Sequence, residues 1–402
     1  MGTIRFVVAA ALAAFWVASA DAADPIKVGL TGPFTGGSSS MGVSMRDGVK
    51  LAVDEINKKG GVLGRPIVLV ERDDEAKNEV GVQIAQELIN KEGVVATIGF
   101  VNTGVALASQ RFYEEAEIPV LNSVATGSAI TKQFEPPQFK DNYVFRFAAN
   151  DTIQSGMIVE EAITRQGFKR PAILADATNY GQLGRDDLVK ALAAKGLKAV
   201  AIEKFNIKDV DMTSQLLRAR EASADVILTY GIGPELGQIA NGMAKLGWKV
   251  PLIGSWTLAM GSFIDTAGPN GDGAMMPQTF IQNPNTPRRK AFIEAYQKSF
   301  AIDRMPSPVS AAQGYDSVYV LAAAIEQAKK TDGPALKDAL ENLKVKVEGV
   351  VTIYDRPFSR GDHEAITANI PVFGVVKGGR VVAARDEDIA GEKAIRIKQS
   401  GQ

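Results

Sequence analysis

The chain has 402 residues, a formal net charge of −1 and no cysteine. Apolar residues make up 46% and charged residues 23%, which is ordinary for a globular protein with a packed core. A charge near zero, without a basic stripe, gives no reason to expect a nucleic-acid or anionic-membrane partner. The lack of cysteine excludes disulfides, zinc–thiolate sites, a cysteine nucleophile and a lipid-modified amino-terminal cysteine. At roughly 150 residues per domain, the length suggests two or three domains.

Residues 1–22 have the pattern of a cleavable signal peptide. Arg5 supplies a positive start, residues 6–17 are wholly apolar, and small residues lead to Ala22, after which we expect cleavage. A membrane anchor is the alternative, but the apolar run is shorter than the ~20 residues that a span needs. An exported chain without cysteine fits the bacterial periplasm, so we expect a soluble periplasmic protein.

In the mature part, short apolar runs alternate with amphipathic helical patterns. The first half has expected strands at residues 26–30, 66–71, 94–98 and 118–121. Helical patterns lie between them, at residues 45–58, 80–91 and 105–115. After residue 143 the pattern restarts, with expected strands at residues 172–175, 198–205, 226–230 and 252–254. This alternation predicts parallel sheets covered by helices on both faces, an α/β fold.

The last third of the chain is mainly helical. Amphipathic helices are expected at residues 287–299, 311–329 and 333–342. A strand at 349–354 and a hairpin made by 370–376 and 380–384 follow. Because these helices have too few strands of their own to form a core, we expect them to cover the first sheet.

Two turns rich in hydroxyl groups and small residues follow neighbouring strands, at residues 100–104 and 122–126. The carboxyl ends of parallel strands meet at one edge of a sheet, where ligands of open α/β sheets bind. Thr103 also stands where a helix begins, and free N–H groups and the helix dipole favour an anion there. The stretch therefore indicates a carboxylate site. Equally open is that Asn102 or Thr103 only caps the helix.

The usual catalytic and cofactor motifs are absent. His363 is the one histidine, so a metal site built on His and Cys is not available. A Ser-His-Asp triad would have to use His363, which stands in a turn-like stretch, and we expect a structural role for it. No phosphate loop is present, and Gly231, Gly233 and Gly237 lack the dinucleotide-binding spacing. We expect no metal, no cofactor and no catalytic residue, while catalysis by carboxylates alone stays open.

An ordered series of motifs runs along the mature chain. It comprises residues 25–36, 48–57, 60–64, 73–74, 99–126, 179–181 and 314–319. In order and spacing, this series resembles the branched-chain amino-acid type of periplasmic substrate-binding protein of ABC importers, with the type I periplasmic binding fold. The resemblance covers essentially the whole mature chain.

The resemblance implies two doubly wound, parallel-sheet α/β lobes that are joined by three crossovers and close on a ligand by hinge motion. The first lobe would hold residues 23–146 and 278–354, and the second would hold 147–277 and 355–402. Such a protein is a monomer that captures a small carboxylate and delivers it to permease and ATPase subunits of the inner membrane. Alternatives are a ligand sensor of the same fold and a secreted α/β enzyme.

The resemblance also implies which residues bind the ligand. In the family, first-lobe turns hold the ligand carboxylate through hydroxyl and backbone N–H groups. The matching positions here are Val101, Asn102, Thr103, Val124, Ala125 and Thr126. The second lobe would contribute the aromatic Tyr180, with Asp151 and Ile232 as neighbours. Ordinary loop packing is the alternative for each.

This chain departs from the family pattern at two positions. Members that bind amino acids commonly carry an acidic residue after the strand matching 252–254, and it pairs the ligand ammonium. Ser255 and Trp256 stand there, and Met41 occupies a first-loop position that is often aromatic. Asp151 or Asp316 could substitute, since an unpaired buried ammonium is costly. More simply, the ligand has no ammonium, and we favour an aromatic or other apolar carboxylate over a branched-chain amino acid. Its flat body would be enclosed by Trp256, Tyr180, Phe34 and Met41.

Overall fold

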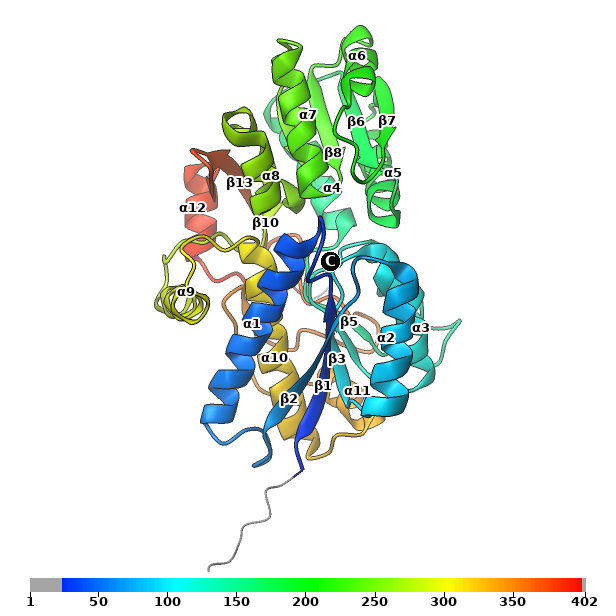
Figure 1. Cartoon of the computed structure of the whole chain (residues 1–402), viewed down its shortest axis with the longest axis vertical. Helices are drawn as coiled ribbons and strands as arrows, with labels where there is room; N and C mark the ends of the chain where they lie inside the picture. Colours follow the sequence, from blue (N-terminus) through cyan, green and yellow to red (C-terminus); the bar gives the residue numbers. More distant parts are fainter. Residues whose placement is uncertain (1–23, 400–402) are drawn as a thin grey trace, which may run out of the picture.

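The computed structural model describes residues 24–399 and arranges them in two α/β lobes, one above the other in Figure 1. The predicted signal peptide, residues 1–22, lies outside the described residues. Among residues 24–399, no helix is both long and apolar enough to cross a bilayer.

The lower lobe contains a sheet of five parallel strands in the order β2-β1-β3-β4-β5. These strands are β1 (Ile26–Gly32), β2 (Ile67–Asp73), β3 (Ala96–Gly99), β4 (Val120–Asn122) and β5 (Val144–Arg146). The central strands β3 and β4 are buried throughout, as expected of a parallel sheet with helices on both faces.

Helices from both ends of the chain cover this sheet (Figure 1). They are α1 (Ser39–Lys58), α2 (Asn78–Glu87), α3 (Thr103–Glu115), α10 (Pro308–Ala328) and α11 (Gly333–Glu341), while α9 (Pro287–Phe300) packs against α1. A π-helical turn, Leu88–Glu92, continues α2. Helix α10 packs along α1 and against β3, which confirms that a late helix returns to the first sheet. The contact is close, because a Cβ at Gly48 would lie 2.1 Å from the carbonyl oxygen of Ala311.

The upper lobe contains a sheet of seven strands in the order β14-β13-β10-β9-β8-β6-β7. They are β6 (Pro171–Asp176), β7 (Ala201–Phe205), β8 (Val226–Tyr230), β9 (Leu252–Gly254), β10 (Met275–Gln278), β13 (Val372–Lys377) and β14 (Arg380–Ala383). Strands β6 to β10 are parallel, while β13 and β14 form the predicted hairpin, antiparallel to β10. The expected fold of two α/β lobes is thus confirmed, with an antiparallel edge on the second sheet.

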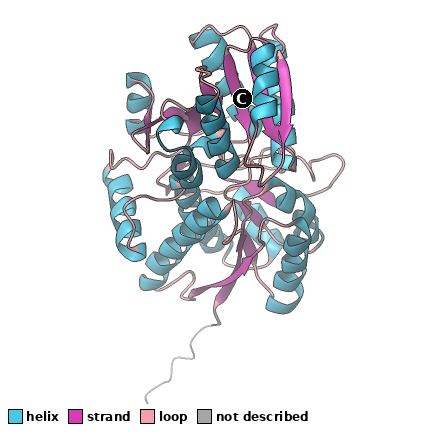
Figure 2. Ribbon diagram, turned by 45° about the horizontal axis from the view of Figure 1, so that its top comes forward, coloured by secondary structure: helices cyan, strands magenta, loops and turns pink. Residues whose placement is uncertain are grey.

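The helices of the upper lobe lie around this sheet, as Figure 2 shows. They are α4 (Asp151–Val159), α5 (Asn179–Ala194), α6 (Thr213–Glu221), α7 (Gly233–Lys245), α8 (Gly261–Ala267) and α12 (Asp386–Lys393). A π-helical turn, Glu160–Arg165, continues α4, and 3-10 turns Trp256–Ala259 and Gly268–Gly271 flank α8. The chain passes between the lobes three times: between β5 and α4, between β10 and α9, and between the segment after β12 and β13.

Two local predictions are wrong. The single strand expected at 349–354 is instead a small antiparallel pair, β11 (Val347–Glu348) and β12 (Ile353–Tyr354). The turn between them forms because the Asp316 carboxylate accepts the N–H groups of Val350 at 2.7 Å and Val351 at 2.9 Å. Helix α1 begins at Ser39 and not at Met45, so the glycine- and serine-rich loop after β1 is shorter than its composition suggests.

Candidate functional site

The two polar turns lie side by side at the edge of the first sheet that faces the second lobe. Ser123 N–H donates to the carbonyl of Gly99 at 2.6 Å, and Ala125 N–H donates to that of Phe100 at 2.8 Å. The N–H of Gly127 donates to the Thr103 hydroxyl at 3.2 Å. The turns therefore form one hydrogen-bonded unit. The Ala125 N–H, expected to bind a ligand carboxylate, is already used within the protein.

The amino terminus of α3 lies in this unit without a capping side chain from its N-cap residue. Asn102 is that residue, but its side chain makes no capping hydrogen bond. Its Nδ2 donates instead to Ser38 Oγ at 3.1 Å, and the Thr103 hydroxyl accepts the N–H of Gly127. The interpretation in which these residues only cap the helix is thus wrong. The N–H groups of the first turn keep their capacity to bind an anion.

The remaining first-lobe candidates differ in exposure. Met41, Val101, Val124 and Thr126 are buried. Phe34 is only half-buried, and the guanidinium carbon of Arg46 lies 5.1 Å from its ring centroid. Phe34 therefore already has a partner for one face of its ring.

Tyr180 joins a buried hydroxyl network in the second lobe. Its hydroxyl donates to Ser255 Oγ at 2.7 Å, and Ser255 Oγ lies 2.8 Å from Thr257 Oγ1. The rings of Tyr180 and Tyr230 have centroids 5.4 Å apart, and the Tyr230 hydroxyl donates to the carbonyl of Asp151 at 3.3 Å. Ser255 stands where relatives commonly carry an acidic residue. In this structure it is the hydrogen-bond partner of the Tyr180 hydroxyl.

A small cavity between the lobes is lined by Thr126 of the first lobe and Trp256 of the second. The structure thus brings these two predicted residues together. Glutamines that the sequence did not single out complete the walls: Gln154, Gln278 and Gln313. Gln154 Oε1 accepts the backbone N–H of Trp256 at 3.0 Å, which holds the main chain of Trp256 in place. No motif marks these glutamines, so only the fold could reveal them. Larger cavities lie elsewhere, between α4 and α12 and beside α8, and contain none of the predicted residues.

Asp151 is the most unusual group of the site. Its side chain is fully buried, and neither carboxylate oxygen has a hydrogen-bond partner among the described residues. Burial raises the pKa of Asp151 to about 7, and the positive charge of Arg146 offsets only part of this rise. Burial and the nearby Asp151 carboxylate also raise the pKa of Tyr180 well above its usual value. A buried, unpartnered carboxylate is costly, so Asp151 needs either a proton or a donor from a ligand.

Asp316, the other proposed partner for an ammonium, is engaged elsewhere. Besides two backbone N–H groups, its carboxylate accepts the Tyr354 hydroxyl at 3.0 Å. His363 is also structural, as predicted: its Nδ1 lies 2.9 Å from the carbonyl of Val144 and its Nε2 lies 3.1 Å from Glu341 Oε1. Within residues 24–399, no group of three or more His, Cys, Asp or Glu side chains could hold a metal ion.

Comparison with known proteins places the chain in a family. The model of the family described as periplasmic binding protein matches residues 25–380. The leucine-, isoleucine-, valine-, threonine- and alanine-binding protein of Pseudomonas aeruginosa is 28% identical over 338 residues, covering 84% of this chain and 87% of that protein.

Two solved structures with different bound ligands have the same fold as this chain. The branched-chain amino acid transporter substrate-binding protein LivJ of Streptococcus pneumoniae, in complex with isoleucine, superposes with a TM-score of 0.78 at 25% identity, covering 89% of this chain and 98% of that one. A solute-binding protein of Rhodopseudomonas palustris, in complex with benzoate, superposes with a TM-score of 0.75 at 23% identity, covering 90% and 95%. The second likeness shows the fold alone.

The match to the family model spans both lobes and includes every predicted ligand-binding residue. The relatives are binding proteins and not enzymes, which agrees with the absence of catalytic motifs from the sequence. The chain therefore belongs to the periplasmic binding protein family, is of the branched-chain amino acid ABC transporter type, and is a substrate-binding protein.

Proposed function

We propose that this protein captures a free amino acid with an apolar side chain between its lobes and delivers it to the permease of an ABC importer. The observation that carries the proposal is the buried carboxylate of Asp151, which has no partner for either oxygen. A ligand ammonium would supply both the positive charge and the N–H donors that this carboxylate lacks. The name of the Pseudomonas relative, which binds five amino acids, supports the same ligand class.

The ligand carboxylate would lie at the first-lobe turns. There the amino terminus of α3 lacks a side-chain cap from Asn102, and the Thr103 and Thr126 hydroxyls lie close by. Anions bind well at such helix ends. The apolar side chain would pack against the second-lobe residues Tyr180, Ile232 and Trp256. Met41 would contact it from the first lobe.

Closure of the lobes would enclose this ligand. Helix α3 of the first lobe contacts α5 of the second, and a Cβ at Gly104 would lie 2.9 Å from Asn179 Oδ1. We infer from this contact that the described arrangement is the closed one, and we propose that the empty protein opens about the three crossovers. The moving bodies would be residues 23–146 with 278–354, and residues 147–277 with 355–402. A signal peptide at residues 1–22 would deliver the monomer to the periplasm, where it meets permease and ATPase subunits.

This proposal reverses the preference for an aromatic carboxylate that the sequence favoured. That preference rested on the missing acid at Ser255 and Trp256, whereas the unpartnered Asp151 becomes visible only in the fold. An aromatic acid remains the second candidate, because the indole Nε1 of Trp256 is also buried without a partner among residues 24–399. In that case Asp151 would have to be protonated.

Ligands that differ by one group test the proposal. We would measure thermal shifts of the mature protein with leucine and with 4-methylpentanoate, which is leucine without its ammonium. Benzoate completes the set. A ligand present at about 100 times its Kd stabilises the folded state by about 2.7 kcal/mol. We expect a shift with leucine and none with 4-methylpentanoate. Equal shifts with both, or a shift with benzoate alone, would contradict the role given to Asp151.

A further inference from the structure

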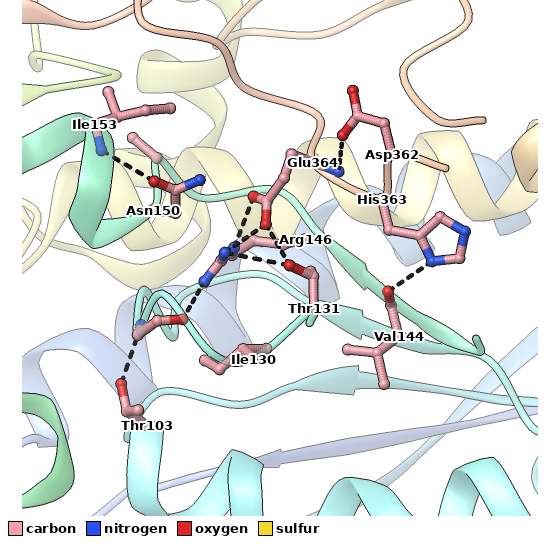
Figure 3. Close-up of polar contacts among 12 residues, drawn as sticks. Thr103, Ile130, Thr131, Val144, Arg146, Asn150, Ile153, Asp362, His363 and Glu364 are labelled. Carbon is pink, nitrogen blue, oxygen red and sulfur yellow. Dashed lines mark hydrogen bonds and ion pairs between the residues drawn. The ribbon is translucent and has the colours of Figure 1, made fainter. Parts of the chain in front are cut away.

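Arg146 is a fully buried cation at the point where the chain first leaves the lower lobe. Its Nε donates to Glu364 Oε2 at 2.8 Å, and its Nη2 contacts the other oxygen of the same carboxylate (Figure 3). Its Nη1 donates to the carbonyl of Gly127 at 2.7 Å. Burial of an ion is tolerated only when its charge and its hydrogen bonds are satisfied in this way.

Glu364 belongs to a distant part of the chain, the last crossover between the lobes. The two segments also pair through their backbones: Arg146 N–H donates to the carbonyl of His363 at 2.9 Å, and Ala365 N–H donates to that of Arg146 at 2.9 Å. The Thr131 hydroxyl donates to Glu364 as well (Figure 3). The first and third crossovers are therefore joined at this ion pair.

Gly127 connects the ion pair to the ligand-binding turn. Its carbonyl accepts from Arg146, and its N–H donates to Thr103. The preceding carbonyl, that of Thr126, accepts the N–H of Asp151 at 2.9 Å. No side chain fits at position 127, because a Cβ there would lie 2.3 Å from Thr103 Cγ2. The turn is thus fixed on one side by Thr103 and on the other by Arg146.

We infer that Arg146 and Glu364 are positioning residues, which hold the turn 124–127 in its binding geometry and connect it to the third crossover. Neither side chain lines the cavity between the lobes. The inference deepens the proposed function, since its effect on affinity presupposes a ligand at this turn. Its effect on the turn itself presupposes none.

The test uses Glu364→Gln, which keeps the shape of the side chain but removes its charge. Glu392→Gln is the matched control, because Glu392 also pairs with a buried arginine: Glu392 Oε1 lies 3.6 Å from Arg289 Nη1, and their side chains are 2% and 7% exposed. That pair makes no contact with the ligand-binding turn. Hydrogen exchange of the ligand-free proteins reports directly on residues 123–131.

We expect amide exchange in residues 123–131 to become about tenfold faster in Glu364→Gln and to stay unchanged in Glu392→Gln. For a ligand that binds the wild type, we expect about tenfold weaker affinity in Glu364→Gln alone, as for loss of a hydrogen bond to a charged group. A merely structural role would lower the melting temperatures of both variants and leave exchange in the turn and affinity unchanged.

The two readouts separate this inference from the proposed function. If no amino acid binds the wild type, the proposed function fails, while the exchange experiment still tests the inference. If leucine binds but the turn is equally protected in wild type and Glu364→Gln, the inference is overturned alone. Should Glu364→Gln not fold, Thr131→Val removes one contact of the same carboxylate, and a smaller change in the same direction is expected.

Discussion

Replacement of Asp151 by asparagine should make the ligand-free protein more resistant to alkaline pH and less able to bind its ligand. Burial raises the pKa of this carboxyl to about 7 from the ordinary 3.8. Between these two pKa values, the folded protein holds a proton on Asp151 that the unfolded chain has lost. The free energy of unfolding of the wild type therefore falls as pH rises through this window. Asparagine does not titrate, so the variant lacks this fall.

The magnitude follows from the shift in pKa. One unit corresponds to about 1.4 kcal/mol, so the full shift corresponds to about 4 kcal/mol above the folded pKa. Between pH 5 and pH 8, the wild type should lose about 2–3 kcal/mol more stability than Asp151→Asn. An asparagine buried without partners has a cost of its own, about 1–3 kcal/mol. That cost does not depend on pH, so it cancels when the two pH dependences are compared.

The assay is urea unfolding of wild type and variant in ligand-free buffer at pH 5, 6, 7 and 8. The two stability curves should separate steadily between pH 5 and pH 7 and run parallel above. Parallel curves over the whole range would show that Asp151 ionises normally, and the account of the site would be wrong. Under the proposed function, Asp151→Asn should also weaken leucine binding at least tenfold at pH 8, where the wild-type carboxylate is charged.

Substitutions at three further positions test other parts of the site. Trp256→Ala should weaken ligand binding at least tenfold and destabilise the fold by about 3–5 kcal/mol, whereas Trp256→Phe should retain most of the affinity, as calorimetry would show. If Trp256→Ala and Trp256→Phe bound the ligand with equal affinity, the indole of Trp256 would not belong to the binding site. Gly127→Ala, whose Cβ would lie 2.3 Å from Thr103 Cγ2, should destabilise by about 1–3 kcal/mol and lower affinity. A normal affinity would mean that the turn adapts. Asp316→Asn should lose about 1–3 kcal/mol, measured by urea unfolding, with unchanged affinity, and a large loss of affinity would contradict its structural role.

The order of elements could be predicted from the sequence because each depends on local patterns. Apolar runs such as 94–98 and 226–230 become the buried strands β3 and β8, and the buried residues of the helices recur with the helical period. The start of α1 was missed because serine and glycine are poor helix formers. There, tertiary contacts outweigh the low helix propensity. The Asn102 side chain donates a hydrogen bond to Ser38, and Gly42 packs closely on the preceding loop, since a Cβ there would lie 2.0 Å from the carbonyl oxygen of Pro33.

The candidate site was less predictable, because its chemistry depends on residues that are distant in the sequence. Thr126 and Trp256 could be named from the resemblance, and they do line one cavity. The state of Asp151 depends instead on its complete burial close to Tyr180 and Tyr230, which come from other elements of the second lobe. The partner of Arg146 lies 218 residues away, and no pattern in one sequence links the two. Sequence patterns thus locate the binding edge, but the fold determines which groups there lack partners.

The unpartnered Asp151 also provides a criterion that separates the two ligand classes without a structure of either complex. Because burial raises its pKa to about 7, the Asp151 carboxyl of the free protein exchanges a proton near neutral pH. An ammonium beside the carboxylate stabilises its charged form, so binding of an amino acid must release protons. A simple carboxylic acid brings a second negative charge to the site, so its binding must take up a proton instead. Calorimetry in buffers of different ionisation enthalpy measures the sign of this exchange, and that sign follows from the charge of the ligand whatever its affinity.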